Sequence, residues 1–160
     1  MLWLAAAALS VAVAEDALLA VGDEAPRIVL QLPDGTLLDS EDLLGTPHVI
    51  DFWSPHCGPC RGMVPALNAA QDRLEEVGGA VLGRTMTALS PTIAAEWGID
   101  YAVGTPMMPG QVDQGELYKV TRLPASFVVG ADGRIAAAFY RMPSQPQLIE
   151  AVEAAVAGGQ

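Results

Sequence analysis

The chain has 160 residues, of which 51% are apolar and 17% charged, and this balance excludes a disordered or fibrous protein. Its 8 basic and 19 acidic residues give a formal charge of -11, which excludes a general nucleic-acid binder and an anionic membrane surface as partners. Two Cys are too few for a disulfide-rich scaffold, and no apolar run reaches the roughly 18–20 residues of a membrane span. One soluble domain of enzyme or binding-module size remains.

Residues 1–14 are predicted to be a cleaved signal peptide, and residues 15–160 a single domain. The first segment carries no charge and ends in Ala12-Val13-Ala14, the small residues that a signal peptidase accepts, directly before an acidic pair. Because no Lys or Arg precedes the apolar run, a buried N-terminal helix is the alternative. Export would place the protein in the periplasm or outside the cell, where paired Cys become oxidised.

The first half of the domain reads as short strands followed by one long helix. Turn residues and β-branched runs predict a strand at 27–32, a turn at 33–35, a hairpin arm at 36–38, a helical turn at 40–44 and a buried strand at 49–53. A helix should begin near Cys57, because apolar residues then recur at steps of three and four until Gly78-Gly79. Pro65 lies inside this helix and is expected to kink it.

The second half adds further strands and two helices. We expect a strand from residue 80, a helix from Ser90-Pro91, an irregular connection over 100–115, a strand at 126–129, a turn at 131–134, a partner strand at 135–140 and a final helix at 144–156. Ser144 and Gln147 form the capping box of that helix. The order of elements predicts a central mixed sheet with helices on both faces.

Cys57-Gly58-Pro59-Cys60 follows the buried strand at the point where the long helix starts. Residues three apart on a first helical turn can bring their sulfurs to the ~2.05 Å of a disulfide bond. Cys57 would sit at the helix N-terminus, where free N–H groups favour a thiolate, whereas Cys60 lies one turn deeper. Cys57 is therefore predicted to attack a foreign disulfide and Cys60 to resolve the mixed disulfide, with the Gly and Pro between them setting the turn.

The run from Asp51 to Arg61 resembles the active site of thioredoxin, and 122–127 resembles the loop that carries the cis-proline of that family. The N-terminal hairpin and the insert before Tyr118 resemble its exported branch, the thiol–disulfide oxidoreductases of the TlpA/ResA type. The resemblance covers roughly residues 22–156. It implies a thioredoxin-like three-layer α/β/α fold with a central mixed sheet and an N-terminal β-hairpin extension.

Asp51 and Pro124 complete the predicted catalytic set. Asp51 has apolar neighbours on its strand, so burial should raise the pKa of its carboxyl, and the resemblance makes it the proton relay to Cys60. A solvated Asp at a strand edge is the alternative. The resemblance also makes Pro124 a cis-proline that leaves the backbone of Leu123 able to pair with an extended substrate. A trans Pro that opens a strand is the other interpretation of this position.

Five residues are predicted to contact substrate: Trp53, His56, Gly58, Pro59 and Leu123. Trp53 is expected to serve first as a platform beneath the Cys motif. His56 stands where the family usually has Trp, and a protonated imidazole there would lower the pKa of the Cys57 thiol. A solvated loop side chain is the alternative interpretation of His56.

The sequence thus predicts a thiol–disulfide oxidoreductase that acts on protein thiols and disulfides outside the cytoplasm. The resemblance of the CGPC motif favours the reducing direction, which calls for a membrane protein as electron donor. No cofactor is required beyond the Cys57–Cys60 disulfide, and we expect a monomer. Two alternatives remain: a Cu- or Zn-binding thiol chaperone, with His48 and His56 among the few further ligands, and a non-catalytic binding module with a permanent disulfide.

Overall fold

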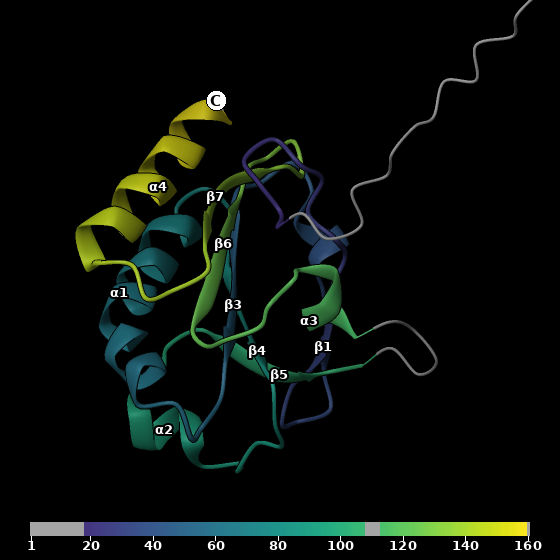
Figure 1. Ribbon diagram of the computed structural model, residues 1–160, viewed down its shortest axis with the longest axis vertical. Coiled ribbons are helices and arrows are strands. Elements are labelled where there is room, and N and C mark those ends of the chain that lie inside the picture. The colour runs from purple at the N-terminus through teal and green to yellow at the C-terminus, as the bar shows by residue number, and fades with distance from the viewer. Residues whose placement is uncertain (1–17, 108–112, 160) are drawn as a thin grey trace, which may run out of the picture.

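The computed structural model describes residues 18–107 and 113–159, so the predicted signal peptide lies outside the described residues (Figure 1). The elements of the described part are, in chain order, β1 (Val29–Gln31), β2 (Leu37–Asp39), the 3-10 turn η1 (Ser40–Leu43), β3 (His48–Trp53), α1 (Gly58–Glu75), β4 (Val81–Thr85), α2 (Ile93–Trp97), β5 (Ala102–Pro106), α3 (Gln114–Leu117), β6 (Ala125–Val129), β7 (Ile135–Phe139) and α4 (Gln145–Gly158). None of these helices is long and apolar enough to cross a membrane.

The seven strands form one mixed sheet in the order β2-β1-β5-β4-β3-β6-β7. The pairs β3–β4 and β4–β5 are parallel, and the remaining pairs are antiparallel. The N-terminal hairpin of β1 and β2 joins this sheet through β5, which confirms the expected hairpin extension. The central strand β3 is buried along its whole length, as its run of β-branched and aromatic residues predicts.

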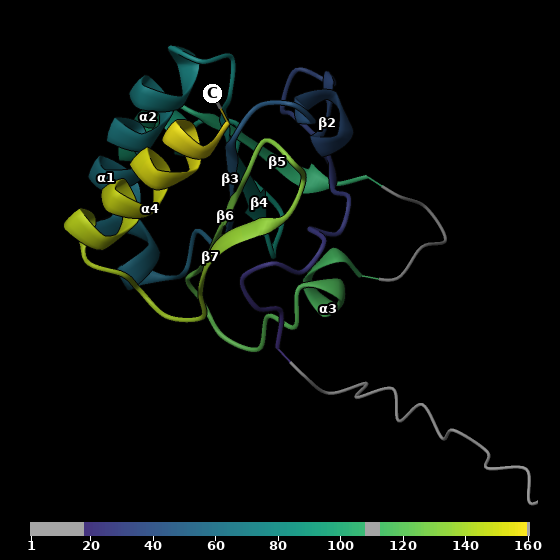
Figure 2. The ribbon, with the colours of Figure 1, turned by 90° about the horizontal axis from the view of Figure 1, so that it is seen from above.

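Helices cover both faces of the sheet, as expected. Figure 2 shows α1, α2 and α4 on one side of the strands and the short α3 on the other. Alternate residues of β3 point to opposite faces, so Val49 and Trp53 join the core under α1 and α4, whereas Ile50 and Phe52 join the second core. Tyr118, directly after α3, fills that second core against Phe52.

Helix α1 forms where the apolar spacing predicts it. Cys57 is its N-cap, Pro59 lies in the first turn, and the residues on the predicted stripe are buried against the sheet: Met63, Leu67, Ala70 and Leu74. The chain leaves the helix through Gly78, whose φ of 80° suits a residue without a side chain. Pro65 lies inside the helix, and the kink expected there stays a prediction.

The prediction of an irregular connection over 100–115 is wrong in two places. Residues Ala102–Pro106 form β5, which pairs with β4 on one side and β1 on the other, and Gln114–Leu117 form α3. Gly104 allows this close approach, because a Cβ atom there would lie 2.7 Å from the backbone oxygen of Gln31. A weak local pattern is thus overridden by pairing with strands on both sides.

Helix α2 also begins later than predicted, with Thr92 rather than Ser90 as its N-cap. Ser90 instead closes a turn, since its backbone oxygen accepts a hydrogen bond from the N–H of Ile93. The first strand is likewise shorter than the predicted 27–32. The capping box of Ser144 and Gln147 at the start of α4 is confirmed.

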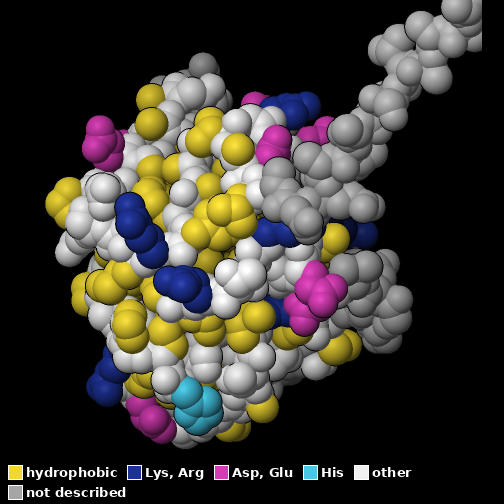
Figure 3. Space-filling model, viewed as in Figure 1, with side chains coloured by type: hydrophobic (Ala, Val, Ile, Leu, Met, Phe, Trp, Pro, Cys, Tyr) yellow, Lys and Arg dark blue, Asp and Glu magenta, His cyan; other side chains and the backbone are white. Residues whose placement is uncertain are grey.

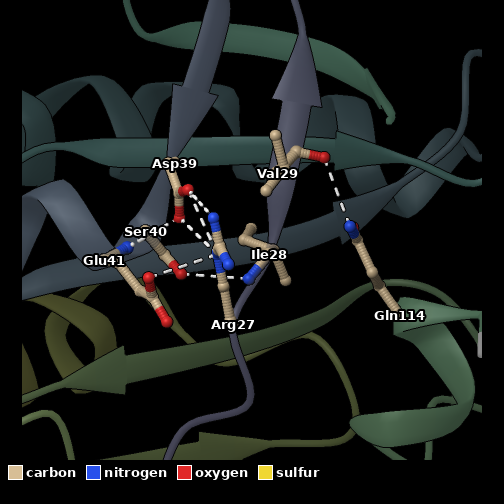
Figure 4. Close-up of polar contacts among 7 residues, drawn as sticks. All are labelled: Arg27, Ile28, Val29, Asp39, Ser40, Glu41 and Gln114. Carbon is tan, nitrogen blue, oxygen red and sulfur yellow. Dashed lines mark hydrogen bonds and ion pairs between the residues drawn. The ribbon is translucent and has the colours of Figure 1, made fainter. Parts of the chain in front are cut away.

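Polar contacts fasten the N-terminal hairpin to its surroundings (Figure 4). Arg27 forms ion pairs with Asp39 and Glu41. The hydroxyl of Ser40 accepts a hydrogen bond from the N–H of Ile28 at 3.0 Å, and Gln114 of α3 donates one to the backbone oxygen of Val29 at 3.2 Å. These bonds hold the β1 segment against β2 and η1 and tie α3 to the sheet.

Candidate active site

Cys57 and Cys60 form a disulfide at the start of α1, with the Cα atoms 5.2 Å apart. The strand β3 ends at Trp53, and a short loop carries the chain from there to Cys57, which caps the helix. Cys57 is half-buried, whereas Cys60 is 3% exposed. The expected asymmetry of the pair is therefore present: one sulfur lies at the surface and the other beneath it.

The helix start provides hydrogen-bond donors for the outer sulfur. The backbone N–H of Cys60 points to the Sγ of Cys57, at an N–S distance of 3.2 Å. In the reduced protein this N–H and the helix dipole favour a thiolate on Cys57. Gly58 and Pro59 are exposed between the two Cys, where they leave the outer sulfur accessible.

Asp51 lies in β3, two residues before the end of that strand, and is 2% exposed. It stands between Val49 and Trp53, which pack in the same core as Cys60, so its side chain points to that face of the sheet. Burial raises the pKa of Asp51 to about 7. The alternative of a solvated Asp at a strand edge is wrong, because β4 and β6 flank β3 on both sides.

Ser126 is a partner of Asp51 that the sequence analysis missed. It lies opposite Asp51 in the β3–β6 pair, and its buried hydroxyl donates a hydrogen bond to Oδ1 of Asp51 at 2.7 Å. This bond opposes the effect of burial and lowers the pKa of the carboxyl. No local motif marks Ser126, because the contact depends on the register of two strands that are far apart in the sequence.

The peptide bond between Leu123 and Pro124 is cis, as the resemblance implied. Pro124 is buried and directly precedes Ala125, the residue of β6 that pairs with Phe52 at the end of β3. Leu123 is partly buried and packs against both cores. The loop at 122–124 therefore lies at the edge of the sheet from which the Cys motif emerges, and its substrate-docking role stays a prediction.

Trp53 and His56 flank the motif in different ways. Trp53 is 2% exposed and packs on Trp97 of α2, with ring centroids 5.4 Å apart, so it lies under the motif as a platform. His56 is exposed, and its backbone N–H donates to the hydroxyl of Ser54 at 3.2 Å. The substrate contacts predicted for both residues remain predictions.

Within the part of the chain that the structure describes, few further side chains that could bind a metal ion lie near the Cys pair. His48 lies at the opposite end of β3 from Trp53, so the strand holds it away from the disulfide. Among the described residues, no group of three or more His, Cys, Asp or Glu side chains is placed to share a metal ion.

The fold and the site together define a class of protein. A disulfide of C-x-x-C spacing caps a helix directly after the central strand, with a buried carboxyl behind it and a cis-proline loop beside it. This arrangement is that of a thioredoxin-fold thiol–disulfide protein. The chain belongs to the AhpC/TSA family, whose sequence model matches residues 21–138.

Several proteins with related sequences or structures point the same way. The chain is 27% identical over 124 residues to the thiol-disulfide oxidoreductase ResA of Bacillus thuringiensis, which covers 72% of this chain and 66% of that protein. It thus spans about two thirds of the length of this relative. It is 43% identical over 53 residues to a thioredoxin of Porphyra purpurea, covering 33% of this chain and 48% of that one.

Solved structures extend the likeness to nearly the whole described fold. A protein of Chlorobium tepidum assigned as a thiol:disulfide interchange protein DsbE superposes with a TM-score of 0.74 at 26% identity, over 86% of this chain and 99% of that chain. A secreted thiol-disulfide isomerase from Corynebacterium glutamicum has a TM-score of 0.71 at 23% identity, over 86% and 91% of the two chains, and shows the shared fold.

Proposed function

We propose that this protein is a thiol–disulfide oxidoreductase that exchanges the Cys57–Cys60 disulfide with protein thiols and disulfides. The observation that carries the proposal is the asymmetric pair at the head of α1: Cys57 accessible and capping the helix, and Cys60 buried behind it. The ResA and DsbE relatives support the same activity. No cofactor takes part beyond the disulfide itself.

In the reducing direction the Cys57 thiolate attacks one sulfur of a substrate disulfide. That disulfide breaks, its second sulfur leaves as a thiolate that takes up a proton, and a mixed disulfide with Cys57 forms. Cys60 then attacks the Sγ of Cys57 after losing its proton, and the remaining substrate sulfur leaves and is protonated. Two electrons pass from the protein to the substrate, whose two sulfurs each take up a proton from solvent, while the proton of Cys60 passes to its acceptor and the Cys57–Cys60 disulfide is formed.

Asp51 is the proposed acceptor of the Cys60 proton. Its carboxyl lies on the sheet face that Cys60 covers, and its raised pKa of about 7 lets it exchange a proton near neutral pH. In the oxidising direction the same steps run backward, and Asp51 returns the proton. Pro124 and Leu123 form the proposed docking edge for an extended substrate, beside the outer sulfur.

We further propose that the protein works outside the cytoplasm as a monomer of one domain, residues 15–160, after cleavage behind Ala14. The segment at 1–14 has the composition of a signal peptide, and the structural neighbour from Corynebacterium glutamicum is secreted. A reductant in an oxidising compartment requires a supply of electrons, for which we propose a membrane dithiol protein. Mass spectrometry of the exported chain tests the cleavage, and an intact Met1 contradicts it.

Reduction of insulin with dithiothreitol as the electron source tests the activity. The wild-type protein is expected to accelerate insulin precipitation, and variants with Ser in place of Cys57 or Cys60 are expected to lose the effect. A wild-type protein without activity overturns the proposal. Titration of the reduced protein with Cu(I) and Zn(II) then distinguishes a metal chaperone, which binds through the two thiols, from a module with a permanent disulfide.

A further inference from the structure

The arginines of this acidic protein divide into two groups. Four of them form ion pairs with described carboxylates: Arg27, Arg73, Arg84 and Arg134. Three others are exposed and form no ion pair with any residue that the structure describes: Arg61, Arg122 and Arg141. Positive charge without a neutralising partner is rare on a chain with a formal charge of -11, so its location is informative.

Arg61 lies next to the disulfide. It follows Cys60 directly in α1, and its backbone N–H donates to the carbonyl oxygen of Cys57 at 3.3 Å. Its guanidinium lies over the ring of Trp97, 5.7 Å from the centroid, and Trp97 in turn packs on Trp53 beneath the motif. The stack holds the charge near the first turn of α1.

Arg122 is exposed and lies two residues before Pro124. Ala125, which directly follows Pro124, pairs with Phe52 at the end of β3. Because β6 runs antiparallel to β3, the start of β6 and the end of β3 meet at the same edge of the sheet, where the Cys motif begins. Arg122 is therefore held at the rim of the site.

Arg141 reaches the same edge from β7. Phe139, the last residue of that strand, pairs with Ser126 near the start of β6. The connection that follows crosses to α1, where the Cε atom of Met142 lies 3.3 Å from the position of a Cβ atom on Gly62, two residues after Cys60. Figure 3 shows basic side chains among apolar ones in the middle of the face, with acidic side chains nearer its margins.

Acidic residues are absent from the three chain segments that carry Arg61, Arg122 and Arg141. Residues 52–71, 117–131 and 133–149 contain no Asp or Glu, although the whole chain has 19. The carboxylate of Glu96, beside Trp97 on α2, accepts a hydrogen bond from the hydroxyl of Thr92. The three segments that carry these arginines thus contain only positive charge, while the rest of the molecule is strongly negative.

We propose that Arg61, Arg122 and Arg141 form an arginine collar that docks partner polypeptides bearing Asp or Glu beside the disulfide to be exchanged. The inference rests on the proposed function and names a substrate class for it. An acidic segment is repelled by most of the surface and attracted to the collar, so the charge distribution steers it to the reactive sulfur. The exposed Met142 and the partly buried Trp97 add apolar contact within the collar.

Three short peptides test the collar, each with a disulfide that joins a fluorophore half to a quencher half. The disulfide is flanked by Glu in the first peptide, by Gln in the second and by Lys in the third. The protein is reduced with dithiothreitol, which is then removed, and the rise in fluorescence is followed. We expect exchange with the Glu peptide to be about fivefold faster than with the Gln peptide at low salt, and the ratio to approach one at about 0.5 M salt.

Two triple variants of equal net charge separate the collar from bulk charge. The variant R61Q/R122Q/R141Q should lose the preference for the Glu peptide. The variant R27Q/R73Q/R134Q removes three paired arginines away from the site and should keep it, since exposed ion pairs contribute little to stability.

The outcomes distinguish failure of the collar from failure of the proposed function. Equal rates with all three peptides, or faster exchange with the Lys peptide, overturn the collar while the oxidoreductase activity stands. Loss of the preference in both triple variants also overturns it, because the preference would then follow total charge. No exchange with any peptide contradicts the proposed function itself.

Discussion

At the scale of single residues, we propose that the carboxyl of Asp51 sets the pH dependence of the step in which Cys60 resolves the mixed disulfide. It is buried in β3 on the face that Cys60 covers, and its raised pKa of about 7 lies where a proton acceptor is most effective at neutral pH. Below that pH the carboxyl is protonated and cannot accept the proton of Cys60. Above it, the carboxylate is available and the resolving step accelerates.

Replacement of Asp51 with Asn removes this proton acceptor without changing the size of the side chain. We expect the rate of mixed-disulfide resolution to fall by about 10-fold to 100-fold at pH 8, because general base catalysis is lost. The rise in rate around pH 7 should vanish as well. Stopped-flow measurement of substrate release between pH 6 and 9 checks this, and an unchanged pH profile in the variant removes Asp51 from the mechanism.

Ser126 is a positioning residue that acts through Asp51. Its hydrogen bond to Oδ1 lowers the pKa of the carboxyl, so Ser126→Ala should raise that pKa further. The midpoint of the pH profile for mixed-disulfide resolution should then shift to higher pH. Carbon-13 NMR of the Asp51 carboxyl measures the pKa directly, with Asp51→Asn as the reference that lacks the signal. A Ser126→Ala variant whose Asp51 titrates as in the wild type contradicts this role.

The residues of the site differ in how far they could be predicted from the sequence. Cys57, Cys60 and Asp51 follow from a local motif and its apolar strand. Ser126 and Arg141 do not. The hydrogen bond of Ser126 to Asp51 depends on the register of two strands, and the placement of Arg141 depends on the path of the chain from β7 to α4. Such long-range placements leave no periodic or local signal.

At the scale of elements, β5 joins the N-terminal hairpin to the rest of the sheet. Gly104→Val would push a side chain into the backbone of β1, where even a Cβ atom would lie 2.7 Å from the oxygen of Gln31. We expect a loss of about 2 kcal/mol or more in the free energy of unfolding, measured by urea denaturation.

Gly158→Ala in α4 is the matched control for this substitution. A Cβ atom there meets nothing within 4 Å, and the change should stay within about 0.5 kcal/mol. A Gly104→Val variant as stable as the control would show that the hairpin is not held against β5.

The long helices were predictable from the sequence, whereas two of the short elements, β5 and α3, were not. Helices α1 and α4 carry apolar stripes and caps that identify them locally. Strand β5 contains Gly and Pro and becomes a strand only by pairing on both sides, and α3 is a single turn that Asp113 caps. Tertiary pairing, which no local propensity reports, creates β5.

At the scale of the whole molecule, the buried carboxyl affects stability as well as chemistry. The pKa of Asp51 is raised in the folded protein to about 7 from an unfolded value near 3.9, so the folded state binds the proton more tightly. The contribution of this proton binding to the stability of the folded state is fully present below about pH 4 and is lost as the pH rises through 7.

Unfolding of the oxidised protein in urea at about pH 5 and about pH 8 tests this linkage. From about pH 5 to about pH 8, the free energy of unfolding of the wild-type protein should fall by about 2 to 3 kcal/mol relative to that of Asp51→Asn, because the variant lacks the titrating group. The comparison cancels the contribution to the pH dependence of stability from the surface carboxylates that both proteins share. If the difference in free energy of unfolding between the two proteins does not change with pH, the raised pKa of Asp51 is contradicted.

The division of labour between the two sulfurs is tested most directly by trapping the mixed disulfide. Reduced Cys60→Ser protein is incubated with oxidised insulin, quenched with acid and examined by mass spectrometry, with Cys57→Ser treated in the same way. We expect a stable insulin adduct on Cys57 in the first variant and none in the second, since the buried Cys60 cannot attack insulin. An adduct formed chiefly on Cys60, or no adduct in either variant, would contradict it.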